Sequence, residues 1–487
     1  MIVADRLFEL AREAPTCAAY RDAARTIDFI TAARAVDRVG TRLDELGVRP
    51  RDRILIVSEN DIATPLLMLA AQRVGAWPAP VNARSGAAEL VAMRACARPR
   101  LVVFATDASV AAAELAEREA TQSWIDAACG SMRIAREVGF DTPAVVDSNV
   151  ALLLFTSGTT GRAKAVMWSH DGLAELGRVL AASRATKAGS VVQCAGPLSH
   201  IMGISNFMAA LAAGATLQLM PRLDVAALVT AIAAGEITHL SLVPTAYQRL
   251  CDYLETRGVS LQDTGLRYIS AGGAPLDAML KERVERLLGL RLVNGYGMTE
   301  CAPGSRTRPD RDASASCIGW PEAGVEMKVD GDDTGELLIR SATRMVGYFG
   351  AAGETAAIVR PDGWLATGDL ARRLPDGSFE LVGRRKEMII RSGFNVYPAE
   401  VEAALNSVRA VSQSAVVGCR LDDGNEEVVA FVRLREPGST DAATIAREAG
   451  QRLAPYKRPS RIVLVDEFPL GPTGKILKHR LGAELTS

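Results

Sequence analysis

Short apolar runs alternate with longer Ala- and Leu-rich stretches through most of the chain, and this alternation limits the folds that it can adopt. The clearest runs are Arg53–Ser58, Leu101–Phe104, Thr238–Val243 and Leu266–Ser270, and each precedes a stretch with helical spacing. A parallel strand returns to its sheet through a crossover that is usually a helix. The pattern therefore predicts an α/β fold with βα units around largely parallel, buried sheets.

The pattern changes after about residue 320, where Gly/Asp turns separate short strands and predict antiparallel hairpins. At 487 residues the chain is also too long for a single hydrophobic core. We therefore expect a large N-terminal domain, residues 1–384, made of two α/β subdomains and a β-rich subdomain. A small, mobile α+β C-terminal domain, residues 385–487, is expected to follow. The charged turn Arg384–Glu387 is either a linker between them or a solvated surface turn.

Charge and cysteine content exclude several classes of protein. The 56 Lys and Arg residues and the 57 Asp and Glu residues nearly cancel, so no basic field favours nucleic acid or an anionic membrane. The eight cysteines form no CxxC pair and no Cys/His cluster, which argues against a structural zinc site. Reduced thiols and the absence of an apolar signal-peptide core predict a cytoplasmic protein.

One long segment without charged residues, Val191–Met220, needs a closer look because it could suggest a membrane span. Glycines and a proline interrupt it, and it carries several polar side chains, including His200 and Asn206. A spanning helix is more uniformly apolar, so we expect a buried strand, loop, helix and strand.

The stretch "TSGTTGRAK", Thr156–Lys164, follows the apolar run Val150–Phe155. Hydroxyl groups, glycines and a lysine suit phosphate, because backbone N–H groups can approach its oxygens without hindrance. The spacing does not fit the P-loop pattern, since no Gly-Lys pair occurs. These residues alone leave two interpretations open, a phosphate-binding loop and an ordinary strand-to-helix connection.

This stretch is the first of seven short motifs whose order is more informative than any one of them. They are, in chain order, "TSGTTGRAK", "PLSH" (Pro197–His200), "SAGGAPL" (Ser270–Leu276), "NGYGMTE" (Asn294–Glu300), "TGD" (Thr367–Asp369), "GRRKEMIIRSGFNVYPAEVE" (Gly383–Glu402) and "GPTGKILK" (Gly471–Lys478). The series resembles the adenylate-forming superfamily, which contains acyl- and aryl-CoA ligases, adenylation domains of peptide synthetases and beetle luciferases. The resemblance covers almost the whole chain.

The resemblance implies an enzyme that joins a small-molecule carboxylic acid to ATP, giving acyl-AMP and pyrophosphate, and then passes the acyl group to a thiol. ATP, Mg²⁺ and coenzyme A are the implied cofactors and substrates. Two alternatives stay open: a stand-alone enzyme that loads a carrier protein, and a non-catalytic relative that binds nucleotide or acyl-CoA. Nucleic acid and a membrane span are not expected, and a homodimer is left open.

The resemblance also implies a nucleotide site. The phosphate loop would be formed by Thr156, Ser157, Gly158, Thr159, Thr160, Gly161 and Lys164. Adenine would be contacted by Gly272, Gly273, Ala274, Tyr296 and Gly297. The ribose would be contacted by Asp369 and Arg384. Tyr296 would stack on the base, and Asp369 would accept hydrogen bonds from both ribose hydroxyls. Two departures from the family's pattern are Ala163, where proline is usual, and Ala366, where arginine is frequent.

Four residues are implied in catalysis: Lys475, Thr299, Glu300 and His200. Lys475 would bridge the attacking carboxylate and the α-phosphate, which Thr299 would also contact. Glu300 would hold Mg²⁺, for which one protein carboxylate suffices because phosphates and water complete the octahedron. Taken alone, Glu300 would be read as a surface acid and His200 as a core histidine. In the family a histidine or aromatic residue at this place gates the acid and thiol channels.

The implied acyl pocket consists of small and apolar residues without Arg or Lys, which favours an aromatic or medium-chain acid over a dicarboxylate. Its members are Val179, His200, Ile201, Ser241, Gly272, Gly295, Gly297, Ala302 and Pro303. Gly393 would line the tunnel for the pantetheine arm of CoA. Lys386 would be the hinge about which the C-terminal domain turns.

Overall fold

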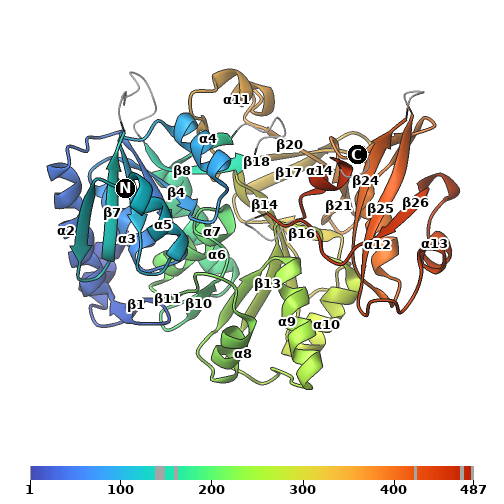
Figure 1. Ribbon diagram of the computed structural model, residues 1–487, viewed down its shortest axis with the longest axis horizontal. Helices are drawn as coiled ribbons and strands as arrows, with labels where there is room; N and C mark the ends of the chain where they lie inside the picture. The colour runs from blue at the N-terminus through green and yellow to red at the C-terminus, as the bar shows by residue number, and fades with distance from the viewer. Residues whose placement is uncertain (1, 138–148, 158–162, 422–424, 472–475, 484–487) are drawn as a thin grey trace.

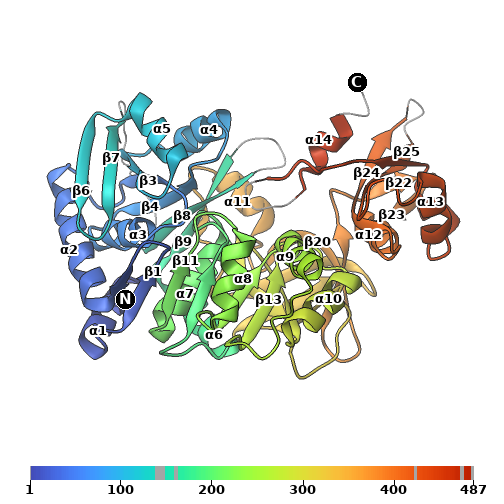
Figure 2. The same cartoon turned by 60° about the horizontal axis from the view of Figure 1, so that its bottom comes forward.

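The computed structural model describes residues 2–137, 149–157, 163–421, 425–471 and 476–483 (Figure 1). It has the predicted mixed α/β architecture, with a large N-terminal part and a small C-terminal part. The elements β24, β25, α12 and α13 of the C-terminal part lie at one end of the molecule in both Figure 1 and Figure 2.

The first α/β unit is built on a five-stranded sheet in the order β4-β3-β5-β7-β6. Its elements are β3 (Arg53–Ser58), α3 (Ala63–Arg73), β4 (Trp77–Asn82), α4 (Ala87–Ala97), β5 (Leu101–Ala105), α5 (Val110–Glu119), β6 (Gln122–Asp126) and β7 (Gly130–Arg136). Alternate residues of β3 face opposite layers: Ile54 packs with the core of α3, and Leu55 with that of α4 and α5. Both faces are covered, as the continuous apolar run predicted.

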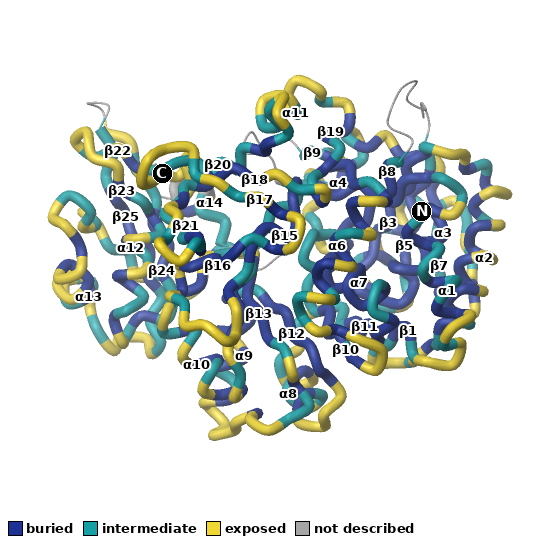
Figure 3. Tube along the Cα trace, turned by 180° about the vertical axis from the view of Figure 1, so that it is seen from behind, coloured by how far each residue is buried: buried dark blue, intermediate teal, exposed yellow. Residues whose placement is uncertain are grey.

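The second α/β unit forms most of a thirteen-stranded sheet, in the order β17-β18-β20-β21-β16-β15-β14-β13-β12-β10-β11-β1-β2. Its elements are α1 (Asp5–Glu13), β1 (Ala18–Arg21), β2 (Thr26–Asp28), α2 (Phe29–Glu45), α6 (His170–Ser183), β10 (Val191–Cys194), α7 (Ile201–Ala213), β11 (Thr216–Leu219), α8 (Val225–Ala233), β12 (His239–Leu242), α9 (Pro244–Arg257), β13 (Tyr268–Gly272), α10 (Ala278–Leu288) and β14 (Leu292–Met298). Strands β11, β10, β12, β13 and β14 are parallel in this sheet. Strands β3, β5, β12 and β13 run through the buried interior in Figure 3.

The uncharged segment Val191–Met220 forms β10, a loop, α7 and β11, as predicted. Within the described ranges, the structure contains no helix with the length and apolar character needed to cross a membrane.

The β-rich part continues the same sheet with antiparallel strands, which confirms the predicted hairpins. Its elements are β15 (Cys301–Arg306), β16 (Cys317–Pro321), β17 (Val325–Asp330), β18 (Gly335–Ser341), β19 (Gly347–Tyr348), α11 (Ala352–Ile358), β20 (Leu365–Arg373) and β21 (Phe379–Arg384). Because one sheet runs through both parts, the ends of β14, β20 and β21 are held in fixed register.

The connection around "TSGTTGRAK" differs from the ordinary strand-to-helix alternative. It joins β8 (Val150–Ser157) to the antiparallel strand β9 (Ala163–Ser169), with Thr156 opposite Lys164. The reason lies in "AVMWS", whose apolar side chains are buried against the sheet. Helix α6 starts only after Ser169, whose hydroxyl accepts a hydrogen bond from the Gly172 amide at 3.0 Å.

The C-terminal part has a core of its own, made of residues from Ile389 onward. Its elements are β22 (Ile389–Arg391), β23 (Phe394–Val396), α12 (Pro398–Asn406), β24 (Val411–Arg420), β25 (Glu426–Leu434), α13 (Ala442–Gly450), the 3₁₀ helix η1 (Pro455–Lys457), β26 (Arg461–Leu464) and α14 (Lys478–Ala483). The sheet order is β24-β25-β26.

The fold makes a prediction at Gly319, which has a φ of +77° on β16. A Cβ atom there would lie 1.8 Å from the Arg306 carbonyl oxygen. Gly319→Ala should therefore lower the free energy of unfolding by about 2–4 kcal/mol, measured by denaturant titration. Gly353→Ala on α11, where a Cβ atom meets open space, is the matched control and should not destabilise the protein. Equal stability of the two variants would contradict the packing described.

Candidate functional site

The loops at the carboxyl ends of β12, β13 and β14 bring several predicted residues together, at the edge where open α/β sheets bind ligands. Gly272 and Gly295 are direct neighbours in the sheet, and the Ser241 and Ser270 hydroxyls lie 2.8 Å apart. A Cβ atom at Gly272 would lie 3.1 Å from the Gly295 carbonyl oxygen. A side chain at Gly272 would press on the neighbouring strand, whereas a Cβ atom at Gly295 would lie 3.6 Å from the Ala271 carbonyl oxygen, an ordinary contact.

The turn after β13 begins helix α10 later than its proline suggests. Gly273 has a φ of +80°, which favours glycine, and Ala274 follows it in the turn. Proline is common at the first helical position, but this helix starts at Ala278, three residues after Pro275. The Asp277 carboxylate caps it by accepting a hydrogen bond from the Leu280 amide at 2.8 Å.

Asp369 is the centre of one polar cluster. Its carboxylate accepts a hydrogen bond from the Tyr296 hydroxyl at 2.6 Å and one from Arg384 Nε at 2.9 Å. The Asp369 side chain is 8% exposed whereas that of Arg384 is 61% exposed, so the cluster is buried at one end and open at the other. Burial, reinforced by the Asp369 charge, raises the pKa of Tyr296, which keeps its hydroxyl a donor. The sequence predicted a stacking role for this ring and gave no sign of the hydroxyl contact.

Glu300 lies in a second cluster just beyond the end of β14. It is buried, so the surface-acid interpretation is wrong. The Tyr348 hydroxyl donates a hydrogen bond to Glu300 Oε1 at 2.7 Å, and burial followed by the Glu300 charge raises the pKa of Tyr348. The preceding carbonyl, that of Thr299, accepts a hydrogen bond from Trp168 Nε1 at 2.9 Å.

Lys164 joins this second cluster from β9. Its ammonium group pairs with the Glu354 carboxylate and lies 4.9 Å from the centre of the Tyr348 ring. The structure therefore brings Lys164 and Glu300 to the same tyrosine. Sequence reasoning missed Tyr348, because a two-residue strand has no periodicity that would reveal its pairing with β9, and it also missed Glu354 on the following helix α11.

The predicted acyl-pocket residues come from α6, α7 and the four neighbouring strands β12, β13, β14 and β15. His200 and Ile201 lie at the start of α7, and Ala302 and Pro303 lie on β15. The side chain of Met202, in the first turn of α7, comes within 3.6 Å of a Cβ position at Gly272. A Cβ position at Gly297 lies 3.4 Å from Ala302 Cβ. Val179 is buried on α6, which packs against α7 and β15.

A buried polar segment directly after β3 holds the backbone before His200. The Asn60 amide donates to the carbonyls of Cys194 at 3.1 Å and Gly196 at 2.9 Å, and its oxygen accepts from the Leu198 amide at 2.8 Å. Its neighbour Glu59 forms ion pairs with Arg84, in the first α/β unit, and with Arg222, after β11. Sequence reasoning also missed this contact of Glu59 between the two α/β units. The only signal was that polar "SEND" directly follows an apolar run.

The C-terminal part holds the predicted CoA residue. Gly393 lies in the β22–β23 turn with a φ of +79° and no atom within 4 Å of its Cβ position. The hairpin packs against β24, β25 and η1, and the Phe394 ring stacks on that of Tyr456 with centroids 4.6 Å apart. Lys386 lies in the turn between β21 and β22.

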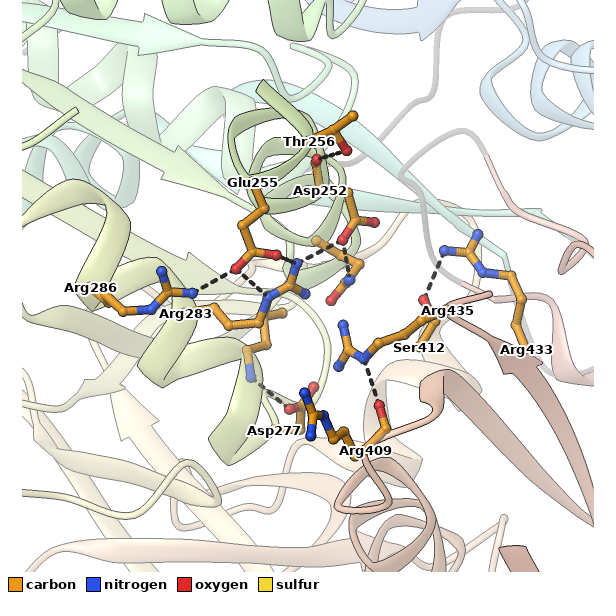
Figure 4. A network of polar contacts seen from close by, with 12 residues as sticks. Asp252, Glu255, Thr256, Asp277, Arg283, Arg286, Arg409, Ser412, Arg433 and Arg435 are labelled. Atoms are coloured by element: carbon orange, nitrogen blue, oxygen red, sulfur yellow. Dashed lines mark hydrogen bonds and ion pairs between the residues drawn. The ribbon is translucent and has the colours of Figure 1, made fainter. Parts of the chain in front are cut away.

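Charged residues line the boundary between α9–α10 and the C-terminal part (Figure 4). Arg433 and Arg435 face Asp252 and Arg283 across it. Burial and the neighbouring Arg283 charge lower the pKa of Arg435, against the opposite effect of the carboxylates. A cavity of about 700 Å³ beside them is lined by residues 222–225 at the start of α8, by α9 residues and by Arg433. Charged side chains of both signs and open volume therefore occur together at this boundary.

Several predicted site residues lie outside the described residues. They are Gly158, Thr159, Thr160, Gly161 and Lys475, together with the side chain of Ser157.

Comparison with known proteins places the chain in a family. AMP-binding enzymes match residues 7–349, and the AMP-binding enzyme C-terminal domain matches residues 400–475. A feruloyl-CoA synthase from an Amycolatopsis species is 32% identical over 96% of each chain. The 4-coumarate–CoA ligase-like 6 protein of Oryza sativa subsp. japonica is 31% identical over 90% of this chain and 78% of its own.

A solved structure agrees with this placement across the whole chain. ATP-bound MatB from Rhodopseudomonas palustris superposes with a TM-score of 0.86 and 28% identity, covering 100% of this chain and 99% of its own. The motif series, the family matches and the fold lead to the same conclusion. The chain belongs to the AMP-binding enzymes, the adenylate-forming family that its motif series resembles.

Proposed function

We propose that the protein activates a carboxylic acid with ATP and transfers the acyl group to coenzyme A. One observation carries the proposal: the segment from Tyr296 to Glu300 meets Asp369 at its start and, through Tyr348, Lys164 at its end. A ribose-binding carboxylate, a metal-binding carboxylate and a phosphate-binding cation would then lie along one nucleotide.

The residues present fit a magnesium ion. Glu300 is a buried carboxylate, and Lys164, a cation suited to phosphate, contacts the same tyrosine, Tyr348. Within the described ranges no group of three or more His, Cys, Asp or Glu side chains could hold a metal. Magnesium takes few protein carboxylates and is held largely by phosphates and water, so Glu300 alone can supply the protein's ligand. When bound, the ion would neutralise charge on the phosphates, while Glu300 holds it and Lys164 binds the phosphate oxygens.

In the proposed reaction a carboxylate oxygen attacks the α-phosphorus, and pyrophosphate leaves. Lys475 and Thr299 would stabilise the charge that develops on the α-phosphate. The CoA thiol then attacks the acyl carbon, losing its proton, and AMP leaves. His200 would contact the acid and gate the thiol channel rather than transfer a proton, because a carboxylate nucleophile needs no base.

An aromatic acid is the favoured substrate class. The predicted pocket is lined by small and apolar side chains without a fixed cation, and the names of the two relatives, a feruloyl-CoA synthase and a 4-coumarate–CoA ligase-like protein, support an aromatic acid. The eight cysteines are free thiols, which supports the expected cytoplasmic location.

The experiment that tests the proposal is pyrophosphate release with ATP, Mg²⁺ and a panel of aromatic and medium-chain acids, with and without CoA. We expect acid-dependent release and a CoA-dependent thioester. Acyl-AMP formation that CoA does not discharge would favour a carrier protein as the acceptor. No release with any acid would favour the non-catalytic alternative.

The first prediction concerns Lys475. Lys475→Ala should slow adenylation by about 10²–10³-fold, the loss typical of one donor aimed at developing charge. Thioester formation from supplied acyl-AMP should change little, because attack on the α-phosphorus has already taken place in that compound. Equal losses in the two half-reactions, followed separately, would exclude this role.

The second prediction concerns domain movement. We propose that the chain divides at 384/385 and that the C-terminal domain turns about Lys386, since it has its own core and meets α9–α10 through a charged boundary beside a cavity. Lys386→Pro should impair one half-reaction far more than the other, because proline fixes φ at the hinge. Gly393→Leu should block only the thiol step. If Lys386→Pro slows both steps alike, or neither, the hinge assignment fails.

The third prediction concerns Asn60. In Asn60→Asp, the amide nitrogen that donates hydrogen bonds to the Cys194 and Gly196 carbonyls is replaced by a carboxylate oxygen. This oxygen repels both carbonyls, so the loop before His200 should shift. The KM for the acid should rise about tenfold, while the KM for ATP stays within about twofold. Gln72→Glu, another buried amide that donates to a carbonyl, is the matched control. It should lower Tm without changing either KM, and an equal effect of both variants on the acid KM would refute the role of Asn60.

A further inference from the structure

The side chain of Tyr348 contacts both proposed phosphate-side groups, Glu300 and Lys164. It lies on β19, whose pairing with β9 sets it opposite Val166, two residues along from Lys164. The tyrosine itself is 6% exposed. The pairing of β19 with β9 therefore fixes the position of Tyr348 independently of its contacts with Lys164 and Glu300.

The two ends of the tyrosine have different neighbours. The hydroxyl donates to Glu300 Oε1 at 2.7 Å, and the ring face lies 4.9 Å from Lys164 Nζ. A hydrogen bond to one carboxylate oxygen restricts the side-chain torsions of Glu300 and fixes the direction of the other oxygen. An ammonium group over an aromatic ring is attracted by the ring's negative face.

A third group, Glu354, competes for the same lysine. Its carboxylate pairs with Lys164 and is 51% exposed, so the pair is weak and a triphosphate can displace it. The ring of Tyr348 does not compete with a phosphate, because it contacts the lysine through its face and offers no anionic oxygen. Lys164 can therefore leave Glu354 without leaving Tyr348.

From these contacts, and resting on the proposed function, we infer that Tyr348 is a positioning residue for Mg·ATP. Its hydroxyl orients Glu300 for the metal, and its ring supports Lys164 for the phosphates. Both groups are thereby ordered before the nucleotide arrives, which lowers the conformational entropy lost on binding.

The test measures nucleotide binding directly, by isothermal titration calorimetry of ATP at a series of Mg²⁺ concentrations, without acid or CoA. Tyr348→Phe keeps the ring and removes the hydroxyl. The Mg²⁺ concentration for half-maximal ATP binding should rise about tenfold, as expected for a lost hydrogen bond to a charged group. At saturating Mg²⁺ the Kd for ATP should stay within about twofold of wild type.

Tyr348→Leu removes the ring as well. Its Mg²⁺ midpoint should rise as in Tyr348→Phe, and its Kd for ATP should also rise about fivefold at saturating Mg²⁺, because Lys164 loses its support. Tyr247→Phe is the matched control, since its buried hydroxyl donates to the Leu240 carbonyl at 3.3 Å. It should leave both values unchanged even if Tm falls.

A double variant separates positioning from a general structural effect. If Tyr348 acts through Glu300, adding Tyr348→Phe to Glu300→Gln should not raise the Mg²⁺ midpoint further. A wild-type midpoint in Tyr348→Phe, or additive effects in the double variant, would overturn the inference. Because binding is measured without acid, failure of the ligase reaction would not produce either result.

Discussion

The buried carboxylate of Asp369, on β20, joins this strand to β14 and β21. It accepts one hydrogen bond from Tyr296 on β14 and one from Arg384, the last residue of β21. A carboxylate that is 8% exposed is costly to bury unless its oxygens are bonded, so these two contacts hold the ends of β14, β20 and β21 together. The proposed ribose ligand is thus also the joint between the second α/β unit and the β-rich part.

Other residues hold the remaining proposed ligands in place around this cluster. Glu300 lies four residues beyond Tyr296, where Tyr348 and the Trp168–Thr299 hydrogen bond fix it against β9 and β19. On the acid side, Asn60 fixes the loop that leads to His200. Each of these proposed site residues is therefore held by a residue on a different helix, strand or loop.

Much of the fold was predictable from local pattern. The run at Arg53–Ser58 became a strand buried on both faces, because β-branched runs of that length suit only such a strand. At two places the short-range signals in the sequence compete. The stretch after Thr156 enters a hairpin because "AVMWS" buries apolar side chains, and α10 starts at Ala278 because the Asp277 cap outweighs the proline signal.

The site was predictable only through its motif series. Asn60 contacts Leu198 across 138 residues, and Tyr348 contacts Glu300 across 48, so neither contact leaves a local pattern in the sequence. Short strands such as β19 are also fixed by tertiary pairing rather than by their own propensity. Such contacts emerge only when the sheets have been assembled.

The central claim is that the acid's own oxygen attacks the α-phosphate of ATP. It is tested most directly with a carboxylic acid labelled with ¹⁸O in its carboxylate, converted to the thioester in the presence of ATP, Mg²⁺ and CoA. We predict that AMP gains one ¹⁸O atom and that pyrophosphate gains none, as mass spectrometry would show. Label in orthophosphate released together with ADP would mean attack at the γ-phosphate and would contradict the account.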